Sequence, residues 1–264
     1  MHPIERLRFV ARAEHAPPDD LVQEAVGSLA GFSADPVALV TACRRLLDRH
    51  PANGPLWWLC ASVLQAADPA DEVWRCADRL HADGTSKALS RGLPDEAAAV
   101  LVGRSDRIGA SLVPRGDVQA WIVDLDGEGW GLVRDLERLD VDATDIPLAG
   151  LASAVAAADV VLLDAQLIGP DRAICGRGSW QAAAVARTSG VPVWLVGGVG
   201  RSVGPRLWPA VLDRLGGASD SPWEGRHDLV PLDLVDQVVD AEGPRPVARA
   251  LATVDVPDAP ELRR

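Results

Sequence analysis

The 264-residue sequence contains no tyrosine and a single lysine, Lys87, so arginine supplies almost all of its positive charge. It has only four cysteines, and no CxxC pair or Cys/His cluster with zinc-ligand spacing occurs. These absences argue against a structural zinc site and against a disulfide framework. No pair of histidines has the HxxxH or HExxH spacing of a metalloenzyme, and we expect neither a metal nor a cofactor.

Long apolar runs are also missing. No stretch approaches the ~20 apolar residues of a membrane span, and Met1–Glu24 is too charged for a signal peptide. We therefore expect a cytoplasmic protein without a membrane-spanning segment. The net charge of -12 would repel a phosphate backbone, which argues against general nucleic-acid binding but leaves room for a local basic site.

What is present divides the chain into two regions of different pattern. Residues 1–90 are predicted to form a helical N-terminal domain. Apolar residues recur there at helical spacing within Asp19–Phe32, Ser33–Asp48, Leu56–Ala67 and Asp71–His81. The adjacent Trp57 and Trp58 are interpreted as packing between helices.

Residues 91–251 instead alternate short apolar runs, typical of strands, with short helical segments. The predicted strands are Ala97–Val102, Gln119–Val123, Ala143–Ile146, Val160–Leu163 and Pro192–Val196. This alternation predicts an α/β fold in which a Rossmann-like domain, with a parallel sheet covered by helices, follows the helical domain. Asp228–Val239 is expected to be a loop followed by a helix, and residues 252–264 a C-terminal tail.

Ligands of such folds bind at the carboxyl ends of the strands, and the longest predicted strand-end loop is Asp164–Gly178. A carboxylate such as Asp164 at the end of a buried strand can accept a proton or bind a sugar hydroxyl. Gly178 allows a close backbone approach, Ser179 begins a helix whose free N–H groups favour an anion, and Arg177 can bind a phosphate. The alternative is that Asp164 caps a turn and Ser179 caps the helix.

Two other strand-end loops contain glycine. Gly197–Gly204 has GxGxxxG spacing but lacks the lysine of a phosphate-binding loop and a following acidic residue to hold a ribose, so nucleotide binding there is not favoured. Gly103, Arg104 and Ser105 could contact a ligand, with a plain tight turn as the alternative.

Four segments in order resemble the family of eukaryotic initiation factor 2B alpha, beta and delta subunits, which includes methylthioribose-1-phosphate isomerase and archaeal ribose-1,5-bisphosphate isomerase. They are RHPANGPLWWL at 49–59, AVLVGRSDRIGASL at 99–112, the stretch from AADVVLLDAQ to VPVWLV at 157–196, and HDLVPLDLVDQVVDAEG at 227–243. The resemblance covers most of the chain between Leu21 and Leu251. It implies a helical domain followed by a Rossmann-like domain.

The departures from the family pattern concern its chemistry. Asp164 matches the family's aspartate, but the isomerases' catalytic cysteine would fall near Gly103–Ser105, where there is none. The phosphate-contacting lysine falls at Gly176, and the segment Asp124–Gly127 lacks the family's arginine. The resemblance therefore implies a catalytically reduced protein that binds a sugar phosphate or nucleotide near Asp164.

The ligand-binding residues implied in this way are Gly103, Arg104, Ser105, Arg177, Gly178 and Ser179. The family's C-terminal domains pair with each other, which implies a homodimer through the C-terminal domain. Two alternatives remain open. One is an aldose–ketose isomerase that uses Asp164, with Arg177 or Cys175 in place of the missing lysine and thiol. The other is a non-catalytic dimeric interaction protein.

Overall fold

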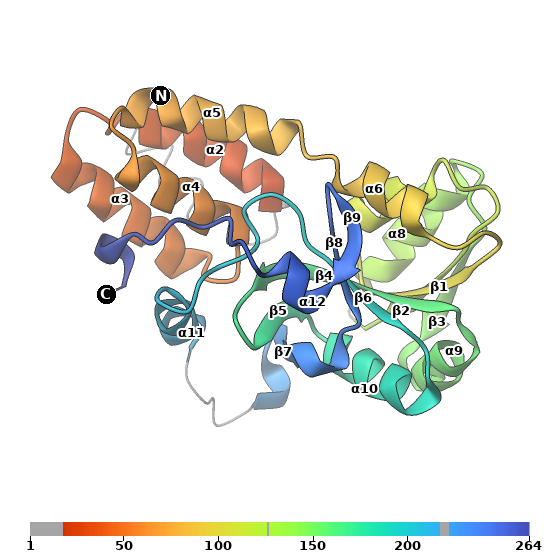
Figure 1. Ribbon diagram of the computed structural model, residues 1–264. Coiled ribbons are helices and arrows are strands. Elements are labelled where there is room, and N and C mark those ends of the chain that lie inside the picture. Colours follow the sequence, from red (N-terminus) through yellow and green to blue (C-terminus); the bar gives the residue numbers. More distant parts are fainter. Residues whose placement is uncertain (1–17, 126, 217–221, 264) are drawn as a thin grey trace.

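The computed structural model of the protein describes residues 18–125, 127–216 and 222–263 (Figure 1). Residues 1–17, which include most of the Met1–Glu24 segment, lie outside the described residues. Figure 1 shows a lobe of long helices beside a second lobe in which helices flank a sheet. The mixed α/β class predicted from the sequence is confirmed, and none of the described helices is long and apolar enough to cross a bilayer.

The helical lobe is built from α2 (Pro18–Ala30), α3 (Pro36–Arg49), α4 (Gly54–Gln65) and α5 (Pro69–His81). An Asp or Asn side chain caps each of the last three, and proline lies in the first turn of each, where its missing N–H costs nothing. Helix α4 is central, because its residues from Gly54 to Val63 are all buried. Trp57 and Trp58 are core residues, as expected, and Arg214 and Arg79 stack on their rings.

The second lobe contains a sheet in the order β3-β2-β1-β4-β6-β8-β9, in which only the β8–β9 pair is antiparallel. The strands are β1 (Ala98–Val102), β2 (Gln119–Asp124), β3 (Ala143–Pro147), β4 (Val160–Ile168), β6 (Val193–Val196), β8 (Gln237–Asp240) and β9 (Gly243–Pro246). The connecting helices are α7 (Asp106–Leu112), α8 (Glu128–Glu137), α9 (Leu151–Ala157), α10 (Ser179–Ser189) and α11 (Trp208–Leu215). The parallel strands have the order of a Rossmann fold, and the direction in which successive strands are added to the sheet reverses between β1 and β4. This topological switch point is where open α/β sheets bind ligands.

The expectation of an open loop over Asp164–Gly178 was wrong. Strand β4 continues to Ile168 and turns back as β5 (Arg172–Gly176), which pairs in turn with β7 (His227–Pro231). The turn between β4 and β5 carries Gly169, Pro170 and Asp171, three residue types that favour tight turns. The apolar residues on either side of this turn are buried, so hairpin pairing satisfies their backbone groups.

The prediction of a helix at the end of Asp228–Val239 was also wrong. The segment forms most of β7, then the 3₁₀ turn η3 (Leu232–Leu234), then β8. Val238 and Val239 are buried because β8 pairs with β6, and this long-range pairing overrides the local helical spacing.

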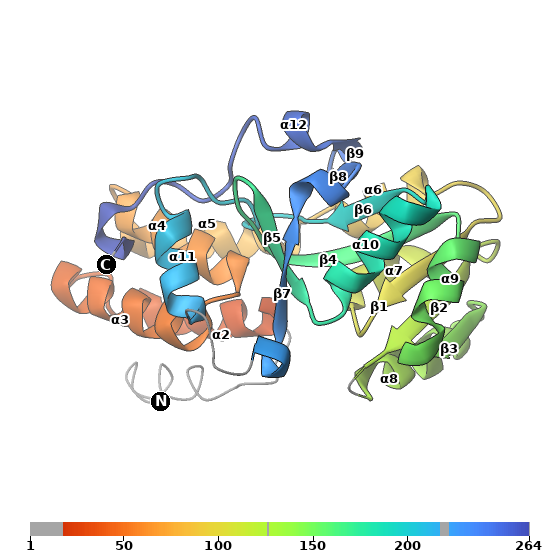
Figure 2. The ribbon, with the colours of Figure 1, turned by 90° about the horizontal axis from the view of Figure 1, so that it is seen from below.

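Two further features of the fold were not predicted: helix α6 (Thr85–Gly92) and the path of the chain after the short helix α12 (Val247–Ala250). Helix α6 packs against α7, β8 and β9, and therefore lies on the sheet side of the molecule. After α12, the chain returns to the helical lobe and ends beside α3 and α4 (Figure 2). There Val256, Ala259 and Leu262 are buried, and Arg44 donates to the Glu261 carbonyl at 2.6 Å.

The two lobes approach each other closely at glycines. A Cβ atom on Gly54 would lie 2.5 Å from the Gln166 carbonyl oxygen, and one on Gly200 would lie 2.9 Å from Cβ of Trp58. The loop that follows β6 therefore lies against the helical lobe. This arrangement places the carboxyl ends of β4 and β6 close to the junction of the lobes.

Candidate functional site

Asp164 lies at the topological switch point. It is the last residue of β4 that pairs with β6, opposite Val196. Leu162 of β4 pairs with Leu101 of β1, so two residues further along, Asp164 and Gly103 lie side by side at the carboxyl ends of these strands. Gly103 has φ +66 and open space where a Cβ would lie. We call Gly103, Arg107, Asp164 and the segment Gly176–Ser179 the switch-point site.

Arg107, in the first turn of α7, is the cation that faces Asp164. Its Nη1 atom lies 3.8 Å from Asp164 Oδ1 and donates to the Gly197 carbonyl. A separation of 3.8 Å is an ion pair but too long for a hydrogen bond. Asp164 Oδ1 is nevertheless buried and accepts no hydrogen bond from any described residue. A buried carboxylate oxygen without a donor marks a place for a hydroxyl, an N–H group or water.

Asp83 fixes the neighbouring glycine loop. Its Oδ2 accepts from Val199 N at 3.1 Å, and its Oδ1 accepts from the amide and the hydroxyl of Thr85 at 2.9 and 2.5 Å. A Cβ on Gly198, which has φ +122, would lie 2.6 Å from Asp83 Oδ2. Packing against Asp83 and Trp58 thus accounts for Gly198 and Gly200 without a nucleotide.

The predicted anion position at the start of α10 is occupied by the protein itself. The Asp228 carboxylate, from β7, accepts from Trp180 N at 2.9 Å. Ser179 is buried, and Gly178, at φ +87, packs so closely that a Cβ would lie 2.8 Å from Leu125. Arg177 is exposed and makes no ion pair with the described residues.

The other predicted ligand-binding residues mostly serve the fold. Arg104 forms ion pairs with Asp106 at 2.8 Å and Asp135 at 3.0 Å, so its charge is compensated. Ser105 is buried and its hydroxyl accepts from Ile108 N at 3.2 Å, which caps α7. The backbone of Gly103 donates to the Val123 carbonyl at 2.9 Å. This geometry favours a capping role for Ser105.

Cys175 and His227 lie on the β5–β7 ribbon beside Asp164. Burial raises the pKa of the Cys175 thiol well above its usual value, and the charges of Asp164 and Asp228 raise it further. Burial lowers the pKa of His227, with a smaller contribution from Arg226. Both groups are therefore held neutral, and a neutral thiol is a poor nucleophile and proton carrier.

Sequence reasoning found Asp164 but missed Arg107, Asp83 and Asp228. The position of Arg107 in the first turn after β1 was a usable signal, because that turn reaches the switch point. Asp228 is brought in by strand pairing across β5, for which no local signal exists. Among the described residues, no three His, Cys, Asp or Glu side chains are grouped as metal ligands.

The fold and the site together define a two-lobed Rossmann-like protein with an N-terminal helical region and a polar site at its switch point. No family model matches the chain, and no curated protein matches it in sequence. Solved structures do match. A Pyrococcus horikoshii OT3 protein described as translation initiation factor eIF-2B superposes with TM-score 0.76 at 12% identity, covering 94% of this chain and 98% of that one.

Two structures from Chaetomium thermophilum are similar to the same degree. The eIF2B beta subunit superposes with TM-score 0.75 at 16% identity, covering 98% of this chain and 92% of that one. A chain of the tetrameric eIF2B-beta2-delta2 complex superposes with TM-score 0.77 at 17% identity, covering 94% and 92%. The chain thus has the fold of the eIF2B subunits, and the resemblance carried by its sequence motifs is confirmed at the level of the fold.

Proposed function

We propose that the protein is a divergent, catalytically reduced member of the eIF2B alpha, beta and delta subunit family that binds a small phosphorylated sugar or nucleotide at the switch-point site. The observation that carries this proposal is the buried Oδ1 atom of Asp164, which accepts no hydrogen bond from the described residues. Sugar hydroxyls are donors that suit such an oxygen. The open space beside Gly103 and Gly176 leaves room for a ligand to approach.

The absence of a working thiol supports binding without the isomerase reaction. Gly103, Arg104 and Ser105 occupy the stretch where the isomerases' cysteine is expected, and Arg104 and Ser105 are engaged in ion pairs and in capping. The nearest cysteine, Cys175, is buried in the core with a raised pKa. A proton-transfer mechanism that needs a thiolate beside Asp164 therefore has no group to supply it.

The phosphate of the ligand would depend on Arg177. The amide of Trp180 is already bonded to Asp228, so the start of α10 does not offer its full anion-binding capacity. Arg177 is exposed and precedes this helix, where its guanidinium can form charge-assisted hydrogen bonds to phosphate. We therefore expect the hydroxyls to contribute most of the affinity and the phosphate contact to weaken with salt.

Thermal shift and calorimetric titration would test this with ribose 1,5-bisphosphate, methylthioribose 1-phosphate and AMP. At least one should stabilise the wild type, and Asp164→Asn should bind it roughly tenfold more weakly, because a charged acceptor becomes a neutral one. Asp145→Asn, an identical change on the exposed strand β3, is the matched control and should bind like the wild type. No stabilisation by any of the three compounds would contradict the proposal.

The isomerase alternative is separated by turnover of the two ribose phosphates. We expect no product from the wild type. Product that disappears in Asp164→Asn would establish the enzyme instead, whereas equal turnover in the two proteins would remove Asp164 from the chemistry.

A second candidate function, that of a dimeric interaction protein, is favoured by exposed apolar side chains. Trp130, Leu148 and Trp180 are 50%, 46% and 46% exposed. Trp130 and Trp180 lie in the first turns of α8 and α10, and Leu148 directly follows β3. All three therefore follow the carboxyl ends of strands and lie on the same edge of the sheet as Asp164. Grouped exposed apolar residues mark interaction surfaces. We therefore propose a homodimer through the C-terminal domain at this edge.

Light scattering measures the mass in solution. The wild type should be a dimer, and Trp130→Ser with Trp180→Ser should shift it toward a monomer. Trp74→Ser, on the exposed face of α5, is the control and should leave the mass unchanged. A monomeric wild type would overturn this proposal without affecting ligand binding at Asp164.

A further inference from the structure

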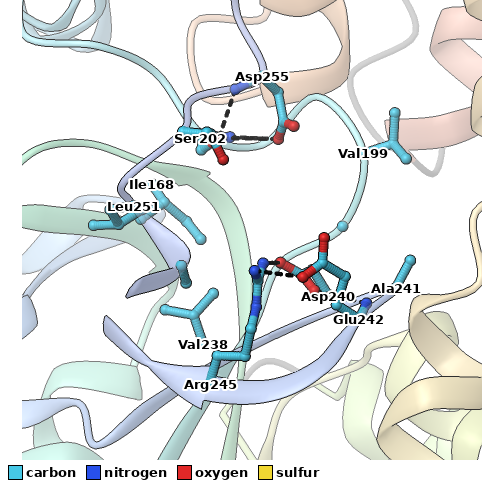
Figure 3. A pocket seen from close by; sticks show the side chains of 14 residues that line it. Ile168, Val199, Ser202, Val238, Asp240, Ala241, Glu242, Arg245, Leu251 and Asp255 are labelled. Atoms are coloured by element: carbon cyan, nitrogen blue, oxygen red, sulfur yellow. Dashed lines mark hydrogen bonds and ion pairs between the residues drawn. The ribbon is translucent and has the colours of Figure 1, made fainter. Parts of the chain in front are cut away.

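A cavity of about 210 Å³ lies between the glycine loop after β6, the β8–β9 hairpin and the segment that follows α12 (Figure 3). It is separate from the switch-point site, because neither Asp164 nor Arg107 lines it. Gly197, Gly198 and Val199 form its wall on the side of the loop. Drug-sized pockets are ~300–1,000 Å³, so this cavity suits a smaller molecule.

Acidic groups lie at two opposite ends of the cavity. At one end Asp255 accepts from the Ser202 hydroxyl at 3.0 Å and from its amide at 3.3 Å, which fixes the carboxylate (Figure 3). At the other end Asp240 and Glu242 both bond to Arg245. Three carboxylates and one guanidinium among the lining residues leave two negative charges uncompensated.

The wall between these ends is apolar. Ile168, Val238 and Leu251 line it, and Figure 3 shows them between Asp255 and Arg245. Such a wall gains little from a hydrated inorganic ion but gains free energy when methylene groups cover it. The three carboxylates lie at opposite ends of the cavity (Figure 3), and among the described residues no three His, Cys, Asp or Glu side chains are grouped so that they could hold one metal ion. The lining therefore favours an organic cation over a metal ion.

The electrostatics of Asp255 favour the binding of a cation in the cavity. Burial raises the pKa of this carboxyl, and the negative charge of Asp240 raises it further, although the bonds from Ser202 lower it. A positive charge placed in the cavity would relieve the unfavourable interaction between the two carboxylates.

We infer that this cavity binds a small aliphatic diamine. One ammonium group pairs with Asp255, the methylene chain covers Ile168, Val238 and Leu251, and the second ammonium group lies against Asp240 and Glu242. This inference is independent of the proposed function, since it involves neither Asp164 nor Arg177.

The test is calorimetric titration of the full chain with 1,4-diaminobutane as the probe. Butylamine, which has one charge, and 1,4-butanediol, which has none, share its carbon chain. We expect the diamine to bind more tightly than butylamine, and the diol not to bind. Asp255→Asn retains an acceptor for Ser202 but removes a charge, and it should weaken diamine binding roughly fivefold, the effect of one partly exposed ion pair.

Three controls keep the result open to refutation. Asp145→Asn carries the same charge change on β3 and should bind the diamine like the wild type. Ala241→Phe adds bulk to a residue that lines the cavity and should abolish binding while leaving the charges intact. Asp164→Asn should bind the diamine normally, which separates this site from the proposed ligand site.

Equal affinity for the diol and the diamine would overturn the inference, as would binding that is unchanged in both Asp255→Asn and Ala241→Phe. Absence of any heat or thermal shift with the diamine at low salt would overturn it as well.

Discussion

The bond between Asp228 and the start of α10 makes a quantitative prediction about anion binding. Replacing Asp228 by alanine removes both the hydrogen bond to Trp180 N and the negative charge beside the helix end. Losing a helix cap costs about 0.5–2 kcal/mol, and losing a favourable charge near the helix end costs about 0.3–1 kcal/mol. Because this bond lies on the exposed side, we expect a combined loss of about 1 kcal/mol.

Asp228→Asn separates the two contributions, because the amide oxygen can still accept from Trp180 N while the charge is gone. We expect it to lose about 0.3–1 kcal/mol. Urea denaturation followed by tryptophan fluorescence measures both variants against the wild type. A second measurement follows the melting temperature as phosphate replaces chloride at constant ionic strength.

The wild type should respond little to phosphate, since its own carboxylate holds the helix end. Asp228→Ala should be stabilised by phosphate, because the freed N–H groups and Arg177 can then bind it. The reasoning would be refuted if the alanine variant were as stable as the wild type, or if both proteins responded equally to phosphate.

Three further predictions test the packing and the neutral groups. Gly54→Ala should destabilise the protein by about 1–3 kcal/mol in urea denaturation, because its Cβ would meet the Gln166 carbonyl. The control Gly131→Ala would meet only the flexible end of an arginine side chain and should be neutral or stabilising. Equal effects of the two substitutions would contradict the close approach of the lobes. Because the Cys175 thiol is buried and its pKa is raised, it should resist alkylation in the folded protein and react on unfolding. Mass spectrometry would measure this labelling, and rapid labelling of the native thiol would count against its burial. The pKa of His227 is lowered from 6.5 in the folded protein, so below that pH the unfolded chain takes up the proton first. The contribution of neutral His227 to stability should therefore be present above pH 6.5 and be lost as the pH falls below it. The unfolding free energy, measured against pH, should fall less steeply on acidification in His227→Gln than in the wild type.

The parts of the fold that the sequence predicted are those whose pattern is local. Three of the four helices of the first lobe begin at an Asp or Asn shortly before a proline, and β1, β2 and β6 are short, mostly apolar runs. The failures occurred where strand pairing over long range decides the outcome. The β4–β5 hairpin depends on β7, more than fifty residues further along the chain in sequence, and β8 is held as a strand by β6.

The same distinction applies to the site. Asp164 was identifiable because a carboxylate at the end of a buried apolar run is unusual. The only signal for its partner Arg107 was its position in the first turn after β1, and Asp228 reaches α10 only through the register of β5 and β7, in which Cys175 lies opposite it. The interpretation of Arg104 and Ser105 as ligand contacts could not anticipate that Asp106, Asp135 and the amide of Ile108 would engage them.

The return of the chain to the helical lobe has a consequence for how the protein folds. The hydrophobic core around Trp57 and Trp58 includes Leu207, Trp208 and Val211, and also Val256, Ala259 and Leu262. That core is therefore assembled from stretches of sequence that precede, interrupt and follow the strands of the Rossmann-like sheet. When synthesis has reached residue 90, helices α2 to α5 have been made, but their apolar faces still lack part of their covering. Final consolidation of this lobe must wait until Val256, Ala259 and Leu262 have been synthesised.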